Sequence, residues 1–348
     1  MESIERFVAG QLTAWEVPGC AIACVRDGDV VLAAGWGRRD TQTGDPVTEN
    51  TLFAIGSVTK AFTVATVGAL VDDGLLDWER PLRDYVPEVR LNDPVVTERL
   101  SMVDLLSHRS GLPRHDLAWV GHPDRSRADL VRRLRFLPLS KDLRQAFQYC
   151  NLGYGLAGHG KSVMSVGTLT RQHAAHIVLP EDRTFPLSTR HAYGLGWMIG
   201  QYRGRRLAEH GGGIDGFQTE CMLLPDDGIG VAVMTNTSSS AMAPVVAYRV
   251  LDELLGLEPF DWFTEFKGRF DALMAGSREV RGARRVVAGA ALPRPLEAYA
   301  GQYDHPGYGT LTITVDGGTL RPHLGTMDLS LAHRHYETFD LEWHELGD

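Results

Sequence analysis

The pair Ser57 and Lys60 is the part of this chain most able to do chemistry. Nowhere else in the 348 residues does a serine stand three positions before a lysine, and only four lysines occur. Residues at i and i+3 share one face of a helix, and a helix N-terminus favours developing negative charge. The spacing therefore predicts a serine nucleophile beside an amine. The alternative is a serine that caps a helix, followed by a solvated lysine.

The residues after Ser57 predict a buried helix. Apolar residues occupy most positions from Ala61 to Val71, and Gly74 suits a helix C-terminus. A lysine one turn into such a helix loses solvation, which lowers the pKa of its amine and makes the neutral base accessible. We therefore expect Lys60 to be a working group of a catalytic site.

Two further motifs would complete that site. Tyr149-Cys150-Asn151 is the only Tyr-x-Asn of the chain, although a loop tyrosine followed by a capping asparagine would look the same. His210 and the glycines 211–213 follow a predicted strand. Glycines at a strand edge let a substrate approach backbone N–H groups closely, as an oxyanion hole requires. The alternative for this motif is a flexible turn.

The order of predicted elements favours an α+β fold. It fits an antiparallel sheet covered by helices with an α-helical insertion. The expected elements are an opening helix at 3–15, a β-hairpin at 21–36, a short strand at 52–55, a helical block at 78–160, strands at 206–210, 218–224 and 229–235, and helices at 243–255 and 262–274.

The domain boundaries follow from composition. Residues 1–276 are expected to form the catalytic domain, with a helical subdomain at about 78–190. A stretch rich in Gly, Ala, Arg and Pro predicts a linker at 277–295. Alternating segments after it predict a small β-rich module over 296–348 that ends abruptly at Asp348.

Composition excludes several functions. The net charge is −9 without a basic stripe, which argues against nucleic acid as a partner. No run approaches 18 apolar residues, and acidic Glu2 and Glu5 stand where a signal peptide carries lysine or arginine. We therefore expect a soluble, cytoplasmic protein that does not bind membranes.

Cysteines and histidines indicate neither disulfides nor a metal. No Cys-x-x-Cys pair occurs, and buried free thiols are expected. The histidines offer no full ligand set, so we expect no metal and no cofactor. The cysteines concerned are Cys20, Cys24, Cys150 and Cys221.

Taken together, the three motifs resemble the class C β-lactamase and DD-peptidase superfamily of serine acyl enzymes, whose first signature is Ser-x-x-Lys. Residues 57–60 match that signature, 149–151 its Tyr-x-Asn companion and 210–212 the third motif. Segments 53–56, 105–113 and 193–197 are also similar to this family. The resemblance covers about residues 5–255 and implies a β-lactamase/transpeptidase-like fold. The tail after Tyr299 resembles the small β-barrel-like module of some members.

The resemblance implies a role for each matched residue. Ser57 would be the nucleophile and Lys60 its proton acceptor, working with Tyr149. Asn151 would hydrogen-bond Lys60 or the acyl amide of the substrate. The N–H groups of Ser57 and Gly213, next to Gly212, would hold the oxyanion. His210 would complete the catalytic set.

Two departures from the family pattern bear on the substrate. His210 stands where β-lactamases and DD-peptidases have lysine, and a histidine is mostly neutral at pH 7. The neutral histidine argues against efficient penicillin recognition. A third motif that begins with histidine is more similar to that of esterases, D-amino-acid peptidases or biosynthetic acyltransferases. Segment 152–192 is also shorter than the helical stretch usual in the family. Either this cleft is trimmed or the sequence omits residues.

The expected function is serine-dependent, ATP-independent acyl transfer through an acyl-enzyme formed from a small-molecule ester or amide. With water as acceptor the protein would be an esterase or amidase. With an amine or alcohol it would be a transacylase in small-molecule biosynthesis. The alternatives are a D-amino-acid peptidase, a β-lactamase-type hydrolase and a non-catalytic binding relative. The sequence predicts no oligomeric state.

Overall fold

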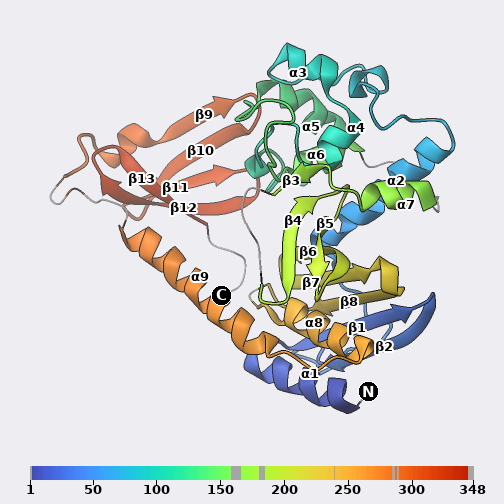
Figure 1. Cartoon of the computed structure of the whole chain (residues 1–348). Coiled ribbons are helices and arrows are strands. Elements are labelled where there is room, and N and C mark those ends of the chain that lie inside the picture. The colour runs from blue at the N-terminus through green and yellow to red at the C-terminus, as the bar shows by residue number, and fades with distance from the viewer. Residues whose placement is uncertain are drawn as a thin grey trace. The chain divides into compact units, whose positions relative to one another are not determined.

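The computed structural model describes residues 2–157, 166–179, 185–238, 240–283, 287 and 290–343. The chain divides into two compact units. The first comprises Met1–Trp78 and Ala157–Arg278, and the second comprises Glu79–Leu156 and Glu279–Asp348. Figure 1 labels the elements of both units.

An antiparallel sheet of eight strands forms the centre of the first unit, in the order β2-β1-β8-β7-β6-β5-β4-β3. The hairpin predicted at 21–36 is confirmed, because β1 pairs with β2, and the strands predicted at 218–224 and 229–235 pair with each other as β7 and β8. The strands are β1 (Gly19–Arg26), β2 (Asp29–Gly37), β3 (Ile177–Val178), β4 (Ser188–Tyr193), β5 (Met198–Tyr202), β6 (Arg205–Ile214), β7 (Phe217–Leu224) and β8 (Ile229–Thr235).

The two faces of this sheet pack on different helices. Leu207 of β6 belongs to a large apolar core with residues of α1 (Glu2–Ala14), α8 (Met242–Leu255) and α9 (Trp262–Ala283). Its neighbour Ala208 packs instead with Ala61 of α2 (Thr59–Asp72) and Trp197. Because side chains alternate along a strand, His210 and Gly212 lie on the same face as Ala208, toward α2.

The second unit combines short helices with a sheet of five strands in the order β13-β12-β11-β10-β9. The predicted small β module is therefore present. The elements are η2 (Leu82–Asp84), α3 (Pro94–Arg99), α4 (Met102–Leu106), η3 (Asp116–Ala118), α5 (Arg127–Arg133), η4 (Leu134–Phe136), α6 (Asn151–Ala157), η6 (Leu296–Tyr299), β9 (Gly301–His305), β10 (Gly309–Asp316), β11 (Thr319–Leu324), β12 (Met327–His335) and β13 (Thr338–Trp343).

Several predicted boundaries were wrong. Residues 52–55 form no strand, and Leu52 is exposed rather than buried. β6 does not end at His210, because its glycines stay paired with β7 as far as Ile214. α9 continues to Ala283, past the predicted end at 274 and into the predicted linker. Residues 158–165 and 180–184, which fall in the short segment 152–192, lie outside the described residues.

The remaining elements of the first unit are α7 (Val166–Gln172), η1 (Gly56–Val58) and η5 (Pro225–Asp227). Cys20 and Cys24 are buried thiols, as predicted, and burial raises the pKa of both to about 12. Cys150 is also buried, whereas Cys221 is half-buried. Among the described residues, no helix combines the length and hydropathy needed to cross a bilayer.

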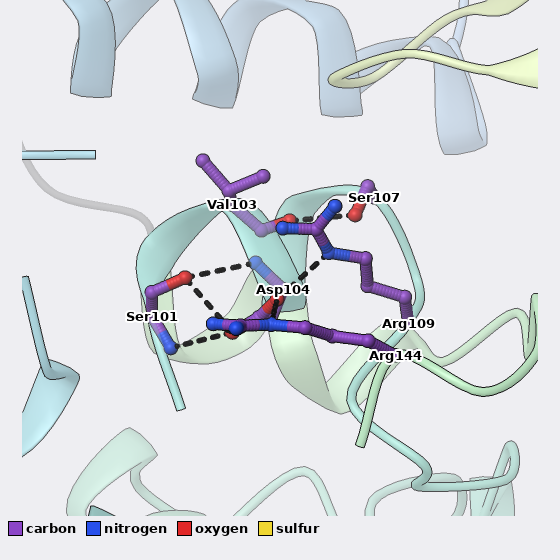
Figure 2. A network of polar contacts seen from close by, with 6 residues as sticks. All are labelled: Ser101, Val103, Asp104, Ser107, Arg109 and Arg144. Atoms are coloured by element: carbon purple, nitrogen blue, oxygen red, sulfur yellow. Dashed lines mark hydrogen bonds and ion pairs between the residues drawn. The ribbon is translucent and has the colours of Figure 1, made fainter. Parts of the chain in front are cut away.

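A buried carboxylate organises the helical part of the second unit (Figure 2). Asp104 of α4 accepts hydrogen bonds from Arg144 Nε at 2.9 Å, from Arg109 Nε at 2.7 Å and from the N–H of Ser101 at 3.0 Å. Burial alone would favour the neutral acid, but these donors together hold the pKa of Asp104 below its ordinary value. Asp104 therefore ties α4 to a segment forty residues further along the chain.

We predict that Asp104→Asn lowers the free energy of unfolding by roughly 1–3 kcal/mol, because it replaces the buried anion that accepts hydrogen bonds from Ser101, Arg109 and Arg144 with a neutral amide. Urea denaturation at pH 7 measures the loss. The matched control is Asp129→Asn, which alters the same kind of capping box at the start of α5 on an exposed surface. Asp129→Asn should lower the free energy of unfolding much less than Asp104→Asn does.

The pH dependence of Asp104 has a fixed sign. Its lowered pKa means that the charged form stabilises the fold above the unfolded-state pKa near 3.9, and that this contribution disappears as pH falls through the folded-state value. The difference between wild type and Asp104→Asn should therefore shrink on acidification below about pH 4. A difference that grows there would contradict this assignment.

Candidate active site

The first two predicted residues lie within hydrogen-bond distance of each other. Ser57 sits in η1, directly before α2, and Lys60 Nζ lies 3.0 Å from Ser57 Oγ. No side chain caps η1 or α2, so Ser57 is not a helix cap. The lysine is only 6% exposed. This geometry fits a nucleophile beside a shielded amine and does not fit a solvated lysine.

Two glycines bring strand β6 against the backbone that carries Ser57. A Cβ on Gly212 would lie 2.0 Å from the carbonyl oxygen of Ile55 and 3.1 Å from Ser57 N. Gly56 has φ +50, and a Cβ there would lie 2.9 Å from Gly213 N. Only glycine combines this conformation with such close approach. The third motif therefore packs directly on the first.

A third close approach fixes Lys60 from the turn between β4 and β5. Gly196 has φ +77, and a Cβ on it would lie 3.0 Å from the carbonyl oxygen of Lys60. The segment 193–197, which resembled the family in sequence, thus holds the first turn of α2. Trp197 packs beside Ala61 on the same side of the sheet.

The imidazole of His210 is buried and engaged on both sides. Nδ1 lies 2.6 Å from the carbonyl oxygen of Gly211, so it must donate there, and Nε2 then accepts from the hydroxyl of Tyr193 at 3.0 Å. Burial lowers the pKa of His210 to about 4. The ring is therefore neutral at pH 7 and supports the backbone of the glycine segment without adding charge to it.

The opposite face of β6 carries charged groups that sequence reasoning missed. Arg190 of β4 makes a two-pronged ion pair with Glu209. Glu220 of β7 is paired with Gly211 in the ladder and is also buried, and Tyr248 of α8 shares a hydrogen bond with Ser188 at 2.9 Å. Burial and the neighbouring charge of Glu209 raise the pKa of Glu220. Arg190 thus lies near two carboxyl groups, those of Glu209 and Glu220, on the face of the sheet opposite to α2.

Tyr149 and Asn151 belong to the second unit, where segment 104–116 positions them. The N–H of Cys150 donates to Nδ1 of His108 at 3.0 Å, and the His108 ring lies 4.3 Å from that of Tyr149. Asn151 Nδ2 donates to Asp116 Oδ1 at 3.2 Å. The role of His108, which is fully buried with φ +59, could be suspected only from its place in segment 105–113.

No metal site accompanies these residues in the described part of the chain, where His, Cys, Asp and Glu side chains do not gather into a group of three or more. The described contacts place the Lys60 amine beside Ser57 Oγ and bring the backbone of Gly212 and Gly213 against that of residues 55–57. This inventory suits nucleophilic chemistry at a hydroxyl.

Comparison with known proteins agrees with this geometry. A family model described as Beta-lactamase matches residues 4–176 and 166–255, well over half of the chain. The chain belongs to the β-lactamase family. It is accordingly an enzyme of the serine-hydrolase type, as the Ser-x-x-Lys pair predicted. A second model, a domain of unknown function (DUF3471), matches residues 286–346, the region of the five-stranded sheet.

A curated relative resembles most of the chain. The unguisins hydrolase ungD′ of Aspergillus campestris is 28% identical over 411 residues, covering 88% of this chain and 76% of the relative. The alignment has more positions than this chain has residues, so the relative carries residues at aligned positions where this chain has a gap.

Solved structures confirm the predicted β-lactamase/transpeptidase-like fold. The octameric penicillin-binding protein homologue of Pyrococcus abyssi aligns with a TM-score of 0.64 at 19% identity, covering 99% of this chain and 98% of that one. The D-amino acid amidase of Ochrobactrum anthropi SV3 aligns with a TM-score of 0.59 at 16% identity, covering 73% and 99%. At such identities the likeness concerns the fold alone.

We predict that Gly212→Ala separates β6 from the Ser57 turn, because its new methyl group would overlap the carbonyl of Ile55. The variant should melt at a lower temperature and lose most of its hydrolase activity. Gly213→Ala is the matched control for stability, since a Cβ there would meet nothing within 4 Å. Equal melting temperatures for the two variants, measured by calorimetry, would contradict the close-approach argument.

Proposed function

We propose that this protein hydrolyses an ester or amide bond in a small-molecule substrate through an acyl-enzyme on Ser57. The observation that carries the proposal is the 3.0 Å separation of Lys60 Nζ and Ser57 Oγ, with the lysine almost wholly buried. A buried amine is easier to deprotonate than an exposed one. Such an amine can accept the hydroxyl proton when the serine attacks.

In the proposed reaction Ser57 Oγ attacks the substrate carbonyl carbon while its proton passes to the neutral amine of Lys60. The bond to the leaving amine or alcohol then breaks, and the leaving group takes a proton as it departs. Water attacks the acyl-enzyme, releases the acid and restores the hydroxyl. We assign the oxyanion to the backbone N–H groups of Ser57 and Gly213, and we propose that Tyr149 shares proton transfer with Lys60.

We propose that the substrate carries no carboxylate on the part that lies beside the third motif, residues 210–212. A lysine there would attract such a group, whereas His210 is neutral at pH 7 and has both nitrogens bonded within the protein. We therefore assign His210 a positioning role behind the glycine segment. The Asn151 amide nitrogen donates to Asp116, and we propose that the Asn151 carbonyl oxygen meets a substrate N–H.

Water is the proposed acceptor. The Aspergillus relatives, which align with 88% or more of this chain, are named as hydrolases of unguisins, and this supports hydrolysis over transfer. A transacylase would form the same acyl-enzyme and differ only in the second step. Product analysis with an added amine separates the two: formation of the amide in place of the acid would replace hydrolase by transacylase.

Ser57→Ala should abolish labelling and turnover. We expect intact-mass spectrometry of the wild type with p-nitrophenyl acetate or an alkyl fluorophosphonate to show a single adduct on Ser57, and little adduct with a penicillin. Lys60→Met should slow acylation by roughly 10²-fold or more, as loss of a general base does. The control is Lys267→Met, an exposed lysine of α9. Labelling that survives Ser57→Ala would refute the nucleophile, and an unlabelled wild type would favour a non-catalytic relative.

Tyr149→Phe tests the shared proton transfer. Loss of the hydroxyl should lower the acylation rate by roughly 10²-fold while leaving the melting temperature close to that of the wild type. Tyr154→Phe is the comparison, because its hydroxyl bonds the backbone of Leu106 and so serves structure. It should lower stability and spare the rate. A wild-type rate in Tyr149→Phe would assign proton transfer to Lys60 alone.

A further inference from the structure

A buried carboxylic acid lies behind the glycine segment of β6, and the proposed reaction does not use it. Glu220 of β7 is paired with Gly211 in the ladder between β6 and β7. Residues directly opposite each other in an antiparallel pair have side chains on the same face. The Glu220 carboxyl therefore lies on the face toward α8, where the Glu209 carboxyl also lies. Only 6% of Glu220 is exposed, so its carboxyl group is shielded from the water that would stabilise a charge.

The hydrogen-bond donors on this face are directed at Glu209. Arg190 contacts both oxygens of the Glu209 carboxylate, with Nη2 at 3.1 Å from Oε2. The hydroxyl of Tyr248 donates to the same Oε2 at 3.4 Å, and the hydroxyl of Ser188 lies 2.9 Å from that of Tyr248. Oε1 of Glu220, in contrast, is buried and has no hydrogen-bond partner among the described residues. Of the two carboxyl groups, Glu209 is therefore the one whose surroundings support a charge.

Glu220 is accordingly a neutral acid at pH 7. Burial is the largest cause that raises its pKa, and the neighbouring charge of Glu209 raises it further, to about 8. Arg190 acts in the opposite direction but does not cancel these two effects. Loss of the Glu220 proton would place two buried anions beside one arginine.

The other groups around Glu220 do not compensate a second negative charge. Burial and the charge of Glu209 raise the pKa of Tyr248 well above its ordinary value, so the phenol of α8 stays neutral. Burial likewise raises the pKa of the Cys221 thiol to about 12. The ladder partner of Glu220 on β8 is the apolar Val233. Ionised Glu220 would therefore gain stabilisation chiefly by moving toward water.

The Glu220 carboxyl adjoins the glycine segment at the position where a side chain is missing. A Cβ on Gly211 would lie 3.2 Å from Glu220 Oε2, and Gly211 itself is exposed. The carbonyl oxygen of Gly211 accepts the hydrogen bond of His210 Nδ1 at 2.6 Å. The next two glycines pack on the backbone that carries Ser57. A displacement of Gly211 would thus reach both the imidazole and the proposed oxyanion donors.

We propose that Glu220 is a positioning residue whose uncharged form keeps residues 210–213 against the Ser57 turn, and whose ionisation displaces this segment and limits activity at alkaline pH. The inference rests on the proposed function and adds a pH control to the same site. Glu220 touches no reacting atom. On ionisation its proton passes to water, and the carboxylate moves toward exposed Gly211 to regain hydration.

The kinetic test compares wild type with Glu220→Gln, which keeps the shape of the side chain and cannot ionise. The rate of Ser57 labelling by an alkyl fluorophosphonate is measured between pH 6 and pH 9.5. Both proteins keep Lys60, so the ratio of their rates removes the titration of that amine. The two rates should be equal at pH 6, and the variant should be about tenfold faster at pH 9, as one ionisation near pH 8 requires.

The matched control for labelling is Glu258→Gln, which alters an exposed glutamate of the same unit. Its labelling rate should follow that of the wild type at every pH. A ratio of Glu220→Gln to wild-type rates that does not change with pH would overturn the proposed limit on activity.

Thermal unfolding tests the buried charge without any substrate. An unfolded glutamate has a pKa near 4.3, so the neutral carboxyl of the folded protein loses its stabilising contribution as pH rises from there through about 8. The melting temperature of the wild type should therefore fall relative to that of Glu220→Gln between about pH 5 and pH 8. Glu220→Met, a second uncharged variant, should show the same trend even if it melts lower throughout. A difference independent of pH would overturn the ionisation of Glu220.

Hydrogen exchange in the inactive Ser57→Ala protein separates positioning from catalysis. Peptides that contain residues 210–217 should exchange faster at pH 9 in this protein than in the same protein with Glu220→Gln added, and equally fast at pH 6. Equal exchange at pH 9 would overturn the positioning role. If the wild type forms no Ser57 adduct, the proposed function fails, while exchange still decides whether Glu220 holds the glycine segment.

Discussion

The structure depends on keeping one amine away from water and within reach of one hydroxyl. Lys60 is almost wholly buried with its Nζ 3.0 Å from Ser57 Oγ, and packing against the sheet helps to hold the first turn of α2 in that place. Close backbone approaches supply the packing: Gly212 meets the carbonyl of Ile55, and Gly196 meets the carbonyl of Lys60. A side chain at either glycine would move the serine or the lysine. The site therefore requires glycine, with no side chain, at these two positions.

Strand β6 links this constraint to the opposite face of the sheet. Because its side chains alternate, His210 and Gly212 serve the face toward α2, while Glu209 and Gly211 serve the face toward α8. Arg190 and Glu209 form an ion pair there through two nitrogen–oxygen contacts, so the pair joins the side chains of β4 and β6 on that face. The strand is therefore held in register by charge on one side and by His210 on the other.

The sequence allowed correct prediction of elements whose turn residues and hydrophobic periodicity indicate the same structure. Prediction failed where contacts between residues distant in the sequence determine the structure. The β7–β8 hairpin carries its own turn residues, and the Ser-x-x-Lys pair lies within one turn. The strand predicted at 206–210 left out glycines 211–213, because glycine weakens an isolated strand, yet β7 pairs with all three. Asp104 and Arg144 stand forty residues apart, and no local pattern joins them. The apolar run at 52–55 resembled a strand, but Leu52 points into solvent.

The residues of the proposed reaction are held in place by separate sets of contacts in the two units. Ser57, Lys60 and the glycines of β6 are held by contacts within the first unit. Tyr149 and Asn151 are held within the second, where the His108 ring lies 4.3 Å from that of Tyr149 and Asp116 accepts a hydrogen bond from Asn151 Nδ2. A substitution at His108 or Asp116 would therefore disturb the Tyr149 motif without altering the contacts that hold Ser57 beside Lys60, because different packing interactions maintain each set.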